Sequence, residues 1–330
     1  MMKKFSKAQL RNFKEKFFKN IGKIKQPLFY RLLFAILINS PALMFHLAAS
    51  WIKMRRWRKI GTCLKFIKRN NLAFENIDVT TLSVESVSGG VSNANQIWKF
   101  RNRFGGETAY FVKVFTPIGS FWAKHLPLVT PFPFIYGRHT HQRFTVDMLS
   151  RVQLADQGVP VPRLIAYDTV QGIMVAEYLK GETVDEILTR IADLGRIDEN
   201  EREVIRRCGF GLGKVHRAGF SLIDTQPVNC IWIESEKKVY FTDLEFCTRE
   251  DKRGWDVGYF LCFLALRLPE DLKREVSEIF LENYQKERPL NLEDVQKTIV
   301  QLKEFLPVFQ AVLDIRQFTP EELFREFVLG

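Results

Sequence analysis

Three polar residues in the last third of the chain have the types and spacing of a metal–nucleotide site. Asp224 is followed five residues later by Asn229, and Asp243 comes after two short apolar runs. Mg²⁺ that carries a nucleotide's phosphates takes few protein ligands, mostly carboxylate and amide oxygens, and completes its shell with phosphate and water oxygens. The three residues therefore form a candidate cluster for Mg²⁺ and a nucleotide, although Asp and Asn are individually common in turns.

A lysine inside an apolar strand pattern adds a candidate contact for an anion. Lys113 lies between Val112 and Val114, and a buried ammonium group needs an anionic partner. The alternative is that Lys113 lies on the solvent face of an edge strand. Upstream of it, residues 89–94 read Gly-Gly-Val-Ser-Asn-Ala, a glycine-rich turn between two β-rich runs.

The elements that must position these residues follow from the hydrophobic pattern. Short β-rich runs separated by glycine-containing turns predict a three-stranded antiparallel unit, and these runs are 82–87, 96–100 and 109–115. A helix is expected over 139–157, and the Gly-Val-Pro-Val-Pro stretch at 158–162 should end it. An apolar, β-like segment follows at 172–179. Beyond residue 187 we expect mostly helix, with two short strands around 230–233 and 239–242.

The order of these features resembles the protein-kinase-like superfamily. A glycine-rich hairpin, a strand lysine, a helix acid, a hinge, Asp-x4-Asn and a final Asp follow one another over about residues 80–310, and the aminoglycoside-phosphotransferase and lipopolysaccharide-kinase branches are the closer likeness. The resemblance implies a bilobal α+β fold. Its antiparallel-sheet N-lobe would span 76–180, with a Pro- and aromatic-rich insertion at 116–136, and its mostly helical C-lobe 181–330.

The resemblance also implies which residues bind the nucleotide. The loop that covers the phosphates corresponds to Gly89, Gly90, Ser92 and Asn93. Lys113 resembles the strand lysine that contacts the α- and β-phosphates, and Asp147 resembles the helix acid that holds this lysine. The backbones of Glu177 and Leu179 would offer a carbonyl and an N–H group to adenine.

The resemblance assigns phosphoryl transfer to the cluster of Asp224, Asn229 and Asp243. Asp224 resembles the catalytic-loop aspartate, Asn229 the second metal ligand and Asp243 the main Mg²⁺ ligand. Asp256 resembles the helix-start aspartate that braces the catalytic loop in small-molecule kinases. ATP and Mg²⁺ are the implied cofactors, and transfer of the γ-phosphoryl group to a hydroxyl is the implied reaction.

The sequence departs from the family pattern in three places. The catalytic loop reads Leu222-Ile223-Asp224 where the family usually has His-Gly-Asp or His-Arg-Asp, so a structural histidine is lost. The motif at 243–245 is Asp-Leu-Glu rather than Asp-Phe-Gly. The stretch between Asp243 and Asp256 contains no Ala-Pro-Glu and is too short for a phosphorylatable activation loop, which disfavours a regulated protein kinase.

The N-terminal segment, residues 1–72, differs in composition from the rest. It carries 18 Lys and Arg against one acidic residue, although the whole chain has a net charge of +11. Residues 32–52 hold no formal charge and are flanked by cations and tryptophans, as a membrane segment would be. Asn-Ser-Pro at 39–41 interrupts this run and both flanks are positive, so an in-plane or re-entrant helical hairpin is favoured over a simple span.

We therefore predict a basic, apolar helical extension over 1–75 that contacts a membrane surface. The expected location is peripheral or monotopic, on the cytoplasmic face. One alternative is that 32–52 is a buried helix pair packed on the main domain. Another is an RNA-binding arm, but RNA binding gives no reason for the uncharged run at 32–52, so nucleic acid is not an expected partner.

The combined prediction is an ATP- and Mg²⁺-dependent kinase that phosphorylates a hydroxyl of a small molecule, lipid or glycolipid at the membrane. A pseudokinase scaffold that binds nucleotide and partners without transfer is one alternative. A compact atypical protein kinase is another.

Several features that could suggest other chemistry are assigned to structure. Glycines at 209–213 lie in a helical pattern over 200–218 with no strand before them, so close helix packing is expected rather than phosphate binding. His46 and His216 have no partner at metal-ligand spacing. The five cysteines form no CxxC pair, which indicates reduced, mostly buried thiols and neither a disulfide framework nor a zinc site.

Overall fold

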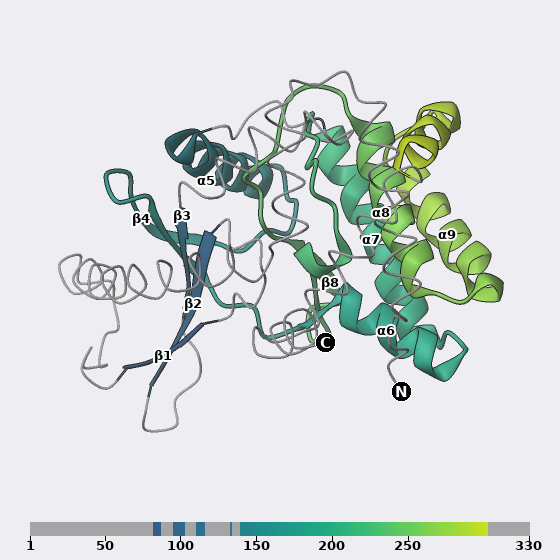
Figure 1. Ribbon diagram of the computed structural model, residues 1–330, viewed down its shortest axis with the longest axis horizontal. Helices are drawn as coiled ribbons and strands as arrows, with labels where there is room; N and C mark the ends of the chain where they lie inside the picture. The colour runs from purple at the N-terminus through teal and green to yellow at the C-terminus, as the bar shows by residue number, and fades with distance from the viewer. Residues whose placement is uncertain (1–81, 87–94, 103–109, 116–132, 134–138, 303–330) are drawn as a thin grey trace, which may run out of the picture. The chain divides into compact units, whose positions relative to one another are not determined.

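The computed structural model describes residues 82–86, 95–102, 110–115, 133 and 139–302 (Figure 1). All of these fall within residues 70–304, which form one compact unit. The predicted N-terminal extension, the phosphate-covering loop and all of the insertion at 116–136 except Pro133 lie outside the described residues. The fold is α+β, as predicted, with two antiparallel sheets and several helices.

The N-lobe is built on a five-stranded antiparallel sheet in the order β1-β2-β3-β5-β4. Its strands are β1 (Leu82–Ser86), β2 (Asn95–Asn102), β3 (Tyr110–Phe115), β4 (Leu164–Asp168) and β5 (Ile173–Glu177). The predicted three-stranded unit is confirmed as β1 to β3. The sequence analysis also anticipated β5 but not β4, whose exposed Tyr167 weakens its apolar pattern.

Strand β3 lies between β2 and β5, with Lys113 opposite Ile97 on one side and Met174 on the other. The alternative that placed Lys113 on the solvent face of an edge strand is therefore wrong. Consecutive residues from Val112 to Phe115 are all buried, so both faces of this strand are covered. A strand in such a position carries a charge only where the charge has partners.

Helix α5 (Thr140–Asp156) covers the face of the sheet that carries Lys113. Phe144 packs edge-on against Phe115 of β3, with ring centroids 5.6 Å apart, and side chains two residues apart on a strand share a face. The helix therefore packs on the face of β3 that carries Lys113, and Asp147 of this helix contacts Lys113 directly. It ends as predicted, since Gly158 adopts a φ of +70°, a conformation that glycine adopts without strain.

The C-lobe combines a three-stranded sheet with packed helices (Figure 1). The sheet has the order β6-β7-β8, and its strands are β6 (Glu182–Thr183), β7 (Cys230–Ile233) and β8 (Lys238–Phe241). The helices are α6 (Val184–Leu194), α7 (Glu199–Arg217), α8 (Arg253–Arg267) and α9 (Glu270–Gln285), with a short 3-10 turn η3 (Pro227–Asn229). The two strands predicted beyond residue 187 are thus confirmed as β7 and β8.

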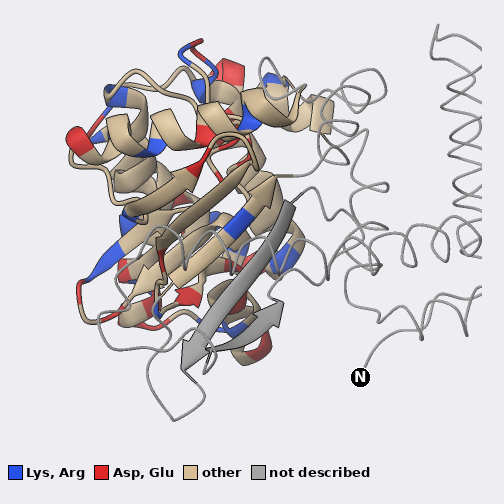
Figure 2. Cartoon of the chain, turned by 90° about the vertical axis from the view of Figure 1, so that its left-hand side faces the viewer, with Lys and Arg blue, Asp and Glu red and all other residues tan. Residues whose placement is uncertain are grey.

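Helices α6 and α7 both start at capping boxes, which explains why the chain enters helix there. Thr183 and Glu186 exchange side-chain and backbone hydrogen bonds at the start of α6, and Asp198 and Glu201 do so at α7. Acidic and basic residues are distributed over the described helices and loops (Figure 2).

The glycines of α7 serve helix packing, as predicted. A Cβ atom on Gly209 would lie 2.2 Å from the carbonyl oxygen of Phe280, and one on Gly213 would lie 2.8 Å from that of Tyr284. Both carbonyl groups belong to α9, so α7 and α9 approach each other at the glycines. The core of the C-lobe lies around this contact, with Phe280 and Tyr284 fully buried.

Candidate active site

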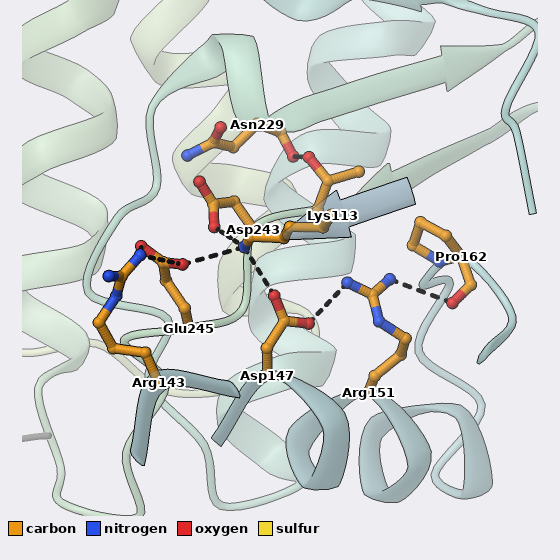
Figure 3. Close-up of polar contacts among 9 residues, drawn as sticks. Lys113, Arg143, Asp147, Arg151, Pro162, Asn229, Asp243 and Glu245 are labelled. Carbon is orange, nitrogen blue, oxygen red and sulfur yellow. Dashed lines mark hydrogen bonds and ion pairs between the residues drawn. The ribbon is translucent and has the colours of Figure 1, made fainter. Parts of the chain in front are cut away.

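The ammonium group of Lys113 lies at the centre of a buried ion cluster (Figure 3). Its Nζ atom is 2.8 Å from Asp147 Oδ2, 2.5 Å from Asp243 Oδ1 and 3.1 Å from Glu245 Oε2. Burial by itself would lower the pKa of Lys113. The three carboxylates, of which Asp147 has the largest effect, together raise this pKa above its usual value. The lysine is therefore held as a cation.

Two arginines of α5 complete the cluster. Arg151 Nη2 lies 2.7 Å from Asp147 Oδ1, and Arg143 Nη2 lies within 3.0 Å of both oxygens of Glu245. Burial would raise the pKa of Asp147, but Lys113 and Arg151 hold it below its usual value. Three cations thus face three carboxylates, which limits the cost of burying charge.

A second group of contacts shapes the predicted catalytic loop. Asp256, near the start of α8, accepts hydrogen bonds from the backbone N–H groups of Leu222 at 2.6 Å and Ile223 at 2.8 Å. Trp255 donates its indole N–H to the Ile223 carbonyl oxygen at 2.9 Å. Ile223 has a φ of 70°, which is costly for a β-branched residue and needs such support. Asp256 braces the loop, as the resemblance implies.

His216 supports this brace from behind. Its Nε2 lies 2.9 Å from Asp256 Oδ2, and its Nδ1 lies 2.5 Å from the hydroxyl of Tyr284. All three side chains are buried. The sequence analysis assigned His216 to structure, but nothing in the spacing of residues along the chain pointed to its two partners.

Asp224, Asn229 and Asp243 meet where the predicted catalytic loop lies beside the end of β8. Asn229 Nδ2 donates to the Asp224 carbonyl oxygen at 3.1 Å. The backbone N–H of Thr242 donates to the Asn229 carbonyl oxygen at 2.8 Å, which places Asn229 beside the residue that precedes Asp243. Asp224 is half-buried, and its carboxylate accepts a hydrogen bond from Gln226 Nε2 at 2.7 Å.

Of the three carboxylates that contact Lys113, Asp243 is the one with access to solvent. Its side chain is 30% exposed, against 0% for Asp147 and 1% for Glu245. Its φ of 57° turns the chain sharply after β8. Burial of the carboxyl group, with Glu245 and Asp224 nearby, outweighs the opposing effect of Lys113 and raises the pKa of Asp243 to about 7.

These residues fit a magnesium ion that also takes phosphate ligands. The amide nitrogen of Asn229 is fixed on the Asp224 carbonyl, and Asn229 and Asp243 together offer one amide and one carboxylate group. Mg²⁺ is usually bound in this way, by one or two protein ligands plus substrate phosphates. Among the described residues, no group of three or more His, Cys, Asp or Glu side chains could hold a metal ion.

The structure brings five of the predicted site residues into this centre, namely Lys113, Asp147, Asp224, Asn229 and Asp243. Glu177 is the last residue of β5, where its Oε1 accepts a hydrogen bond from the Arg163 backbone N–H at 2.7 Å, and Leu179 follows it, half-buried. Gly89, Gly90, Ser92 and Asn93 lie outside the described residues. The roles assigned to all of these residues stay predictions.

Sequence reasoning missed Glu245, Arg143 and Arg151. One signal was present in the sequence, because the two arginines stand four residues before and after Asp147 and so share its helix face. Glu245 was noticed as the last residue of the Asp-Leu-Glu motif at 243–245. Its partner Arg143 was not predicted, because it lies 102 residues away in the sequence.

The part of the chain that the structure describes contains no helix that combines the length and the apolar character needed to cross a membrane. Residues 32–52, where a membrane segment was predicted, lie outside that part.

Comparison with known proteins finds partial matches to Bud32 proteins. The chain is 35% identical over 94 residues to the KEOPS complex subunit Bud32 of Pyrococcus abyssi, covering 28% of this chain and 40% of that protein. It is 28% identical over 130 residues to a probable serine/threonine-protein kinase BUD32 homolog of Archaeoglobus fulgidus, covering 38% of this chain and 57% of the relative. The chain thus spans about half the length of these relatives. They confirm the resemblance to the protein-kinase-like superfamily.

No family model matches the chain. Among solved structures, WaaP in complex with acyl carrier protein aligns with a TM-score of 0.41 and 16% sequence identity, covering 74% of this chain and 88% of that one.

Proposed function

We propose that this chain, which resembles the protein-kinase-like superfamily, is an ATP- and Mg²⁺-dependent phosphotransferase that moves the γ-phosphoryl group to a hydroxyl. The observation that carries the proposal is the buried ion pair of Lys113 and Asp147 in contact with Asp243. Lys113 is buried beside Asp243, a carboxylate that solvent can reach. A metal ion bound to Asp243 and the ammonium group of Lys113 could therefore both contact the phosphates of one nucleotide.

In the proposed reaction, the protein acts mainly by alignment and by neutralising charge. Lys113 binds the α- and β-phosphates, and Asp224 accepts the proton of the acceptor hydroxyl or orients that hydroxyl. Asp256 and Trp255 hold the loop that carries Asp224, through the backbone of Leu222 and Ile223. Mg²⁺ held by Asp243 and Asn229 would neutralise negative charge on the phosphate oxygens.

The residue types at the phosphate and metal positions support an active enzyme over a pseudokinase scaffold. Lys113, Asp224, Asn229 and Asp243 are all chemically competent for their proposed roles. The missing family histidine at Leu222 does not remove a reacting group. A pseudokinase remains the alternative that predicts nucleotide binding without transfer.

The acceptor that we propose is a hydroxyl of a small molecule, lipid or glycolipid at the cytoplasmic face of a membrane. The composition of the chain supports this choice, because the 18 Lys and Arg of the N-terminal segment, residues 1–72, flank the uncharged run at 32–52. Cationic and aromatic flanks around such a run favour contact with an anionic lipid surface. Deleting residues 1–72 should release the protein from membranes, and a full-length protein found in the soluble fraction would contradict this location.

A protein acceptor is the second candidate. It is favoured by the relative from Archaeoglobus fulgidus, which is named a probable serine/threonine-protein kinase. The short stretch between Asp243 and Asp256 weighs against it, because it leaves little chain for a peptide-docking platform.

The test is incubation of the full-length protein with γ-labelled ATP, Mg²⁺ and a membrane extract, beside the Asp224→Ala variant. Label in the lipid or glycolipid fraction that the variant fails to produce would support the membrane kinase. Label on a protein would favour the second candidate. Nucleotide binding with no label in any fraction would contradict phosphoryl transfer and favour the pseudokinase.

A further inference from the structure

Glu245 is a buried acid for which the nucleotide and metal assignments provide no role. Its side chain is 1% exposed. Arg143 Nη2 lies 2.9 Å from Oε1 and 3.0 Å from Oε2, and Lys113 Nζ lies 3.1 Å from Oε2 (Figure 3). Both carboxylate oxygens therefore face cations of the protein.

This environment distinguishes Glu245 from Asp243, two residues earlier. Asp243 is 30% exposed and contacts a cation through Oδ1, whereas Glu245 lies against the guanidinium of Arg143, itself 0% exposed. A divalent cation that approached Glu245 would meet a cation of the protein at each carboxylate oxygen, Arg143 at Oε1 and both Arg143 and Lys113 at Oε2, and like charges at low dielectric repel strongly. Of the two acids, Asp243 is the one placed for a metal.

The pair of Glu245 and Arg143 also joins two parts of the fold. Arg143 belongs to α5, which carries Asp147, and Glu245 follows β8 on the segment that carries Asp243. Arg143, Asp147 and Arg151 recur at intervals of four residues and so lie along one face of α5. Lys113 is thus held by one carboxylate from the helix, Asp147, and by two from the segment after β8, Asp243 and Glu245.

We propose that Glu245 is a positioning residue, which with Arg143 as its counterion holds Lys113 and the Asp243 segment in the arrangement that receives nucleotide phosphates. This inference rests on the proposed phosphotransferase function. If Asp243 bound a metal, Lys113 would lose one carboxylate contact, and Asp147 and Glu245 would still hold the ammonium group from two sides.

The test removes the ion pair of Arg143 and Glu245 without leaving either partner as an unpaired buried charge. A double variant, Arg143→Met with Glu245→Leu, keeps the site neutral and close in volume, as apolar replacements of buried ion pairs can be tolerated. The control is Arg267→Met with Asp185→Leu, which removes another ion pair, 2.9 Å long, between α8 and α6. Calorimetry then measures the Kd of ADP at saturating Mg²⁺, and a Mg²⁺ titration at fixed ADP gives the half-saturating concentration.

We expect the Arg143/Glu245 double variant to fold, by circular dichroism, and to bind ADP about tenfold to a hundredfold more weakly, as misplaced contact groups do. Its half-saturating Mg²⁺ concentration should match that of the wild type, whereas Asp243→Asn should raise this value. The control variant should keep wild-type affinity.

Two results would overturn the inference. One is unchanged ADP affinity in the folded double variant. The other is a Glu245→Gln variant that needs as much extra Mg²⁺ as Asp243→Asn, which would make Glu245 a metal ligand. If the double variant does not fold, Glu245→Asp, which keeps the charge but shortens the side chain, should weaken ADP binding in the same assay, and unchanged binding there also overturns the inference. A wild-type protein that binds no nucleotide overturns the proposed function as well, whereas normal wild-type binding with unaffected variants overturns this inference alone.

Discussion

His216 Nε2 lies 2.9 Å from Asp256 Oδ2, and both side chains are fully buried. The same Asp256 oxygen accepts the backbone N–H of Leu222, so one histidine and one aspartate support the predicted catalytic loop from within the C-lobe. The family's usual loop histidine, which is replaced here by Leu222, is therefore not the sole means of holding this loop.

Replacing His216 should weaken both the fold and the loop. His216→Leu leaves the Asp256 carboxylate and the Tyr284 hydroxyl with one partner fewer each, and a buried polar group that loses its partner costs about 1–3 kcal/mol. We expect the free energy of unfolding in urea to fall by about that amount. Tyr284→Phe takes the hydroxyl partner from the buried His216 Nδ1 and should also cost about 1–3 kcal/mol, while leaving the contact of His216 with Asp256 in place. Equal stability of His216→Leu and the wild type would contradict the role given to this contact.

The two acidic residues of the centre should differ in their kinetic effects. Asp243→Ala removes the proposed metal carboxylate and should abolish Mg²⁺-ATP turnover. Asp224→Ala removes the group proposed to accept or orient the hydroxyl proton, so it should lower kcat by about 10²–10⁴-fold and leave KM for ATP nearly unchanged. Initial rates over a grid of ATP and Mg²⁺ concentrations separate the two effects. Unchanged turnover in both variants would refute the site.

The raised pKa of Asp243 predicts how stability depends on pH without metal. The folded protein keeps a proton on Asp243 up to a pH of about 7, whereas the unfolded chain releases it near the usual aspartate value of 3.8. The folded state therefore binds more protons between these values, so this residue makes stability fall as pH rises through that window.

Urea unfolding in EDTA at several pH values measures this effect. Asp243→Asn cannot titrate at this position, so its stability should gain relative to the wild type between pH 4 and pH 7. Added Mg²⁺ should stabilise the wild type more at pH 8 than at pH 5, because a metal ligand must be deprotonated. Parallel pH profiles of the two proteins would contradict the raised pKa.

Replacing different glycines of α7 by alanine should destabilise the protein to different extents, depending on what the added methyl group meets. Gly209→Ala places Cβ 2.2 Å from the backbone carbonyl oxygen of Phe280. Because α7 and α9 must then move apart, we expect the free energy of unfolding to fall by about 1–3 kcal/mol.

Gly211→Ala is the matched control on the same helix. Its new Cβ would meet the ring of Phe241 at 2.9 Å, a side chain rather than a backbone atom, so the loss should be smaller. Thermal unfolding of both variants tests the order, and a Gly211→Ala variant that is the less stable of the two would show that the α7–α9 contact does not limit the packing.

Local patterns predicted much of the fold because they depend on neighbouring residues. Short β-rich runs separated by glycine-containing turns predicted β1 to β3, and the Gly-Val-Pro-Val-Pro stretch after residue 157 marked the end of α5. Strand β4 escaped prediction because its sequence, Leu-Ile-Ala-Tyr-Asp, does not alternate apolar and polar residues. Its partner β5 stabilises it through pairing that the sequence does not display.

The sequence by itself determined which residues could do chemistry, since Lys113, Asp224, Asn229 and Asp243 were recognisable by type, order and spacing. Only the tertiary structure decided how they are supported. Arg143 meets Glu245 across 102 residues, and His216 meets Tyr284 across 68. Such contacts depend on how helices pack against strands and against each other, and burial makes them matter, because a charge or polar group removed from water is stable only beside a partner that the folded chain brings to it.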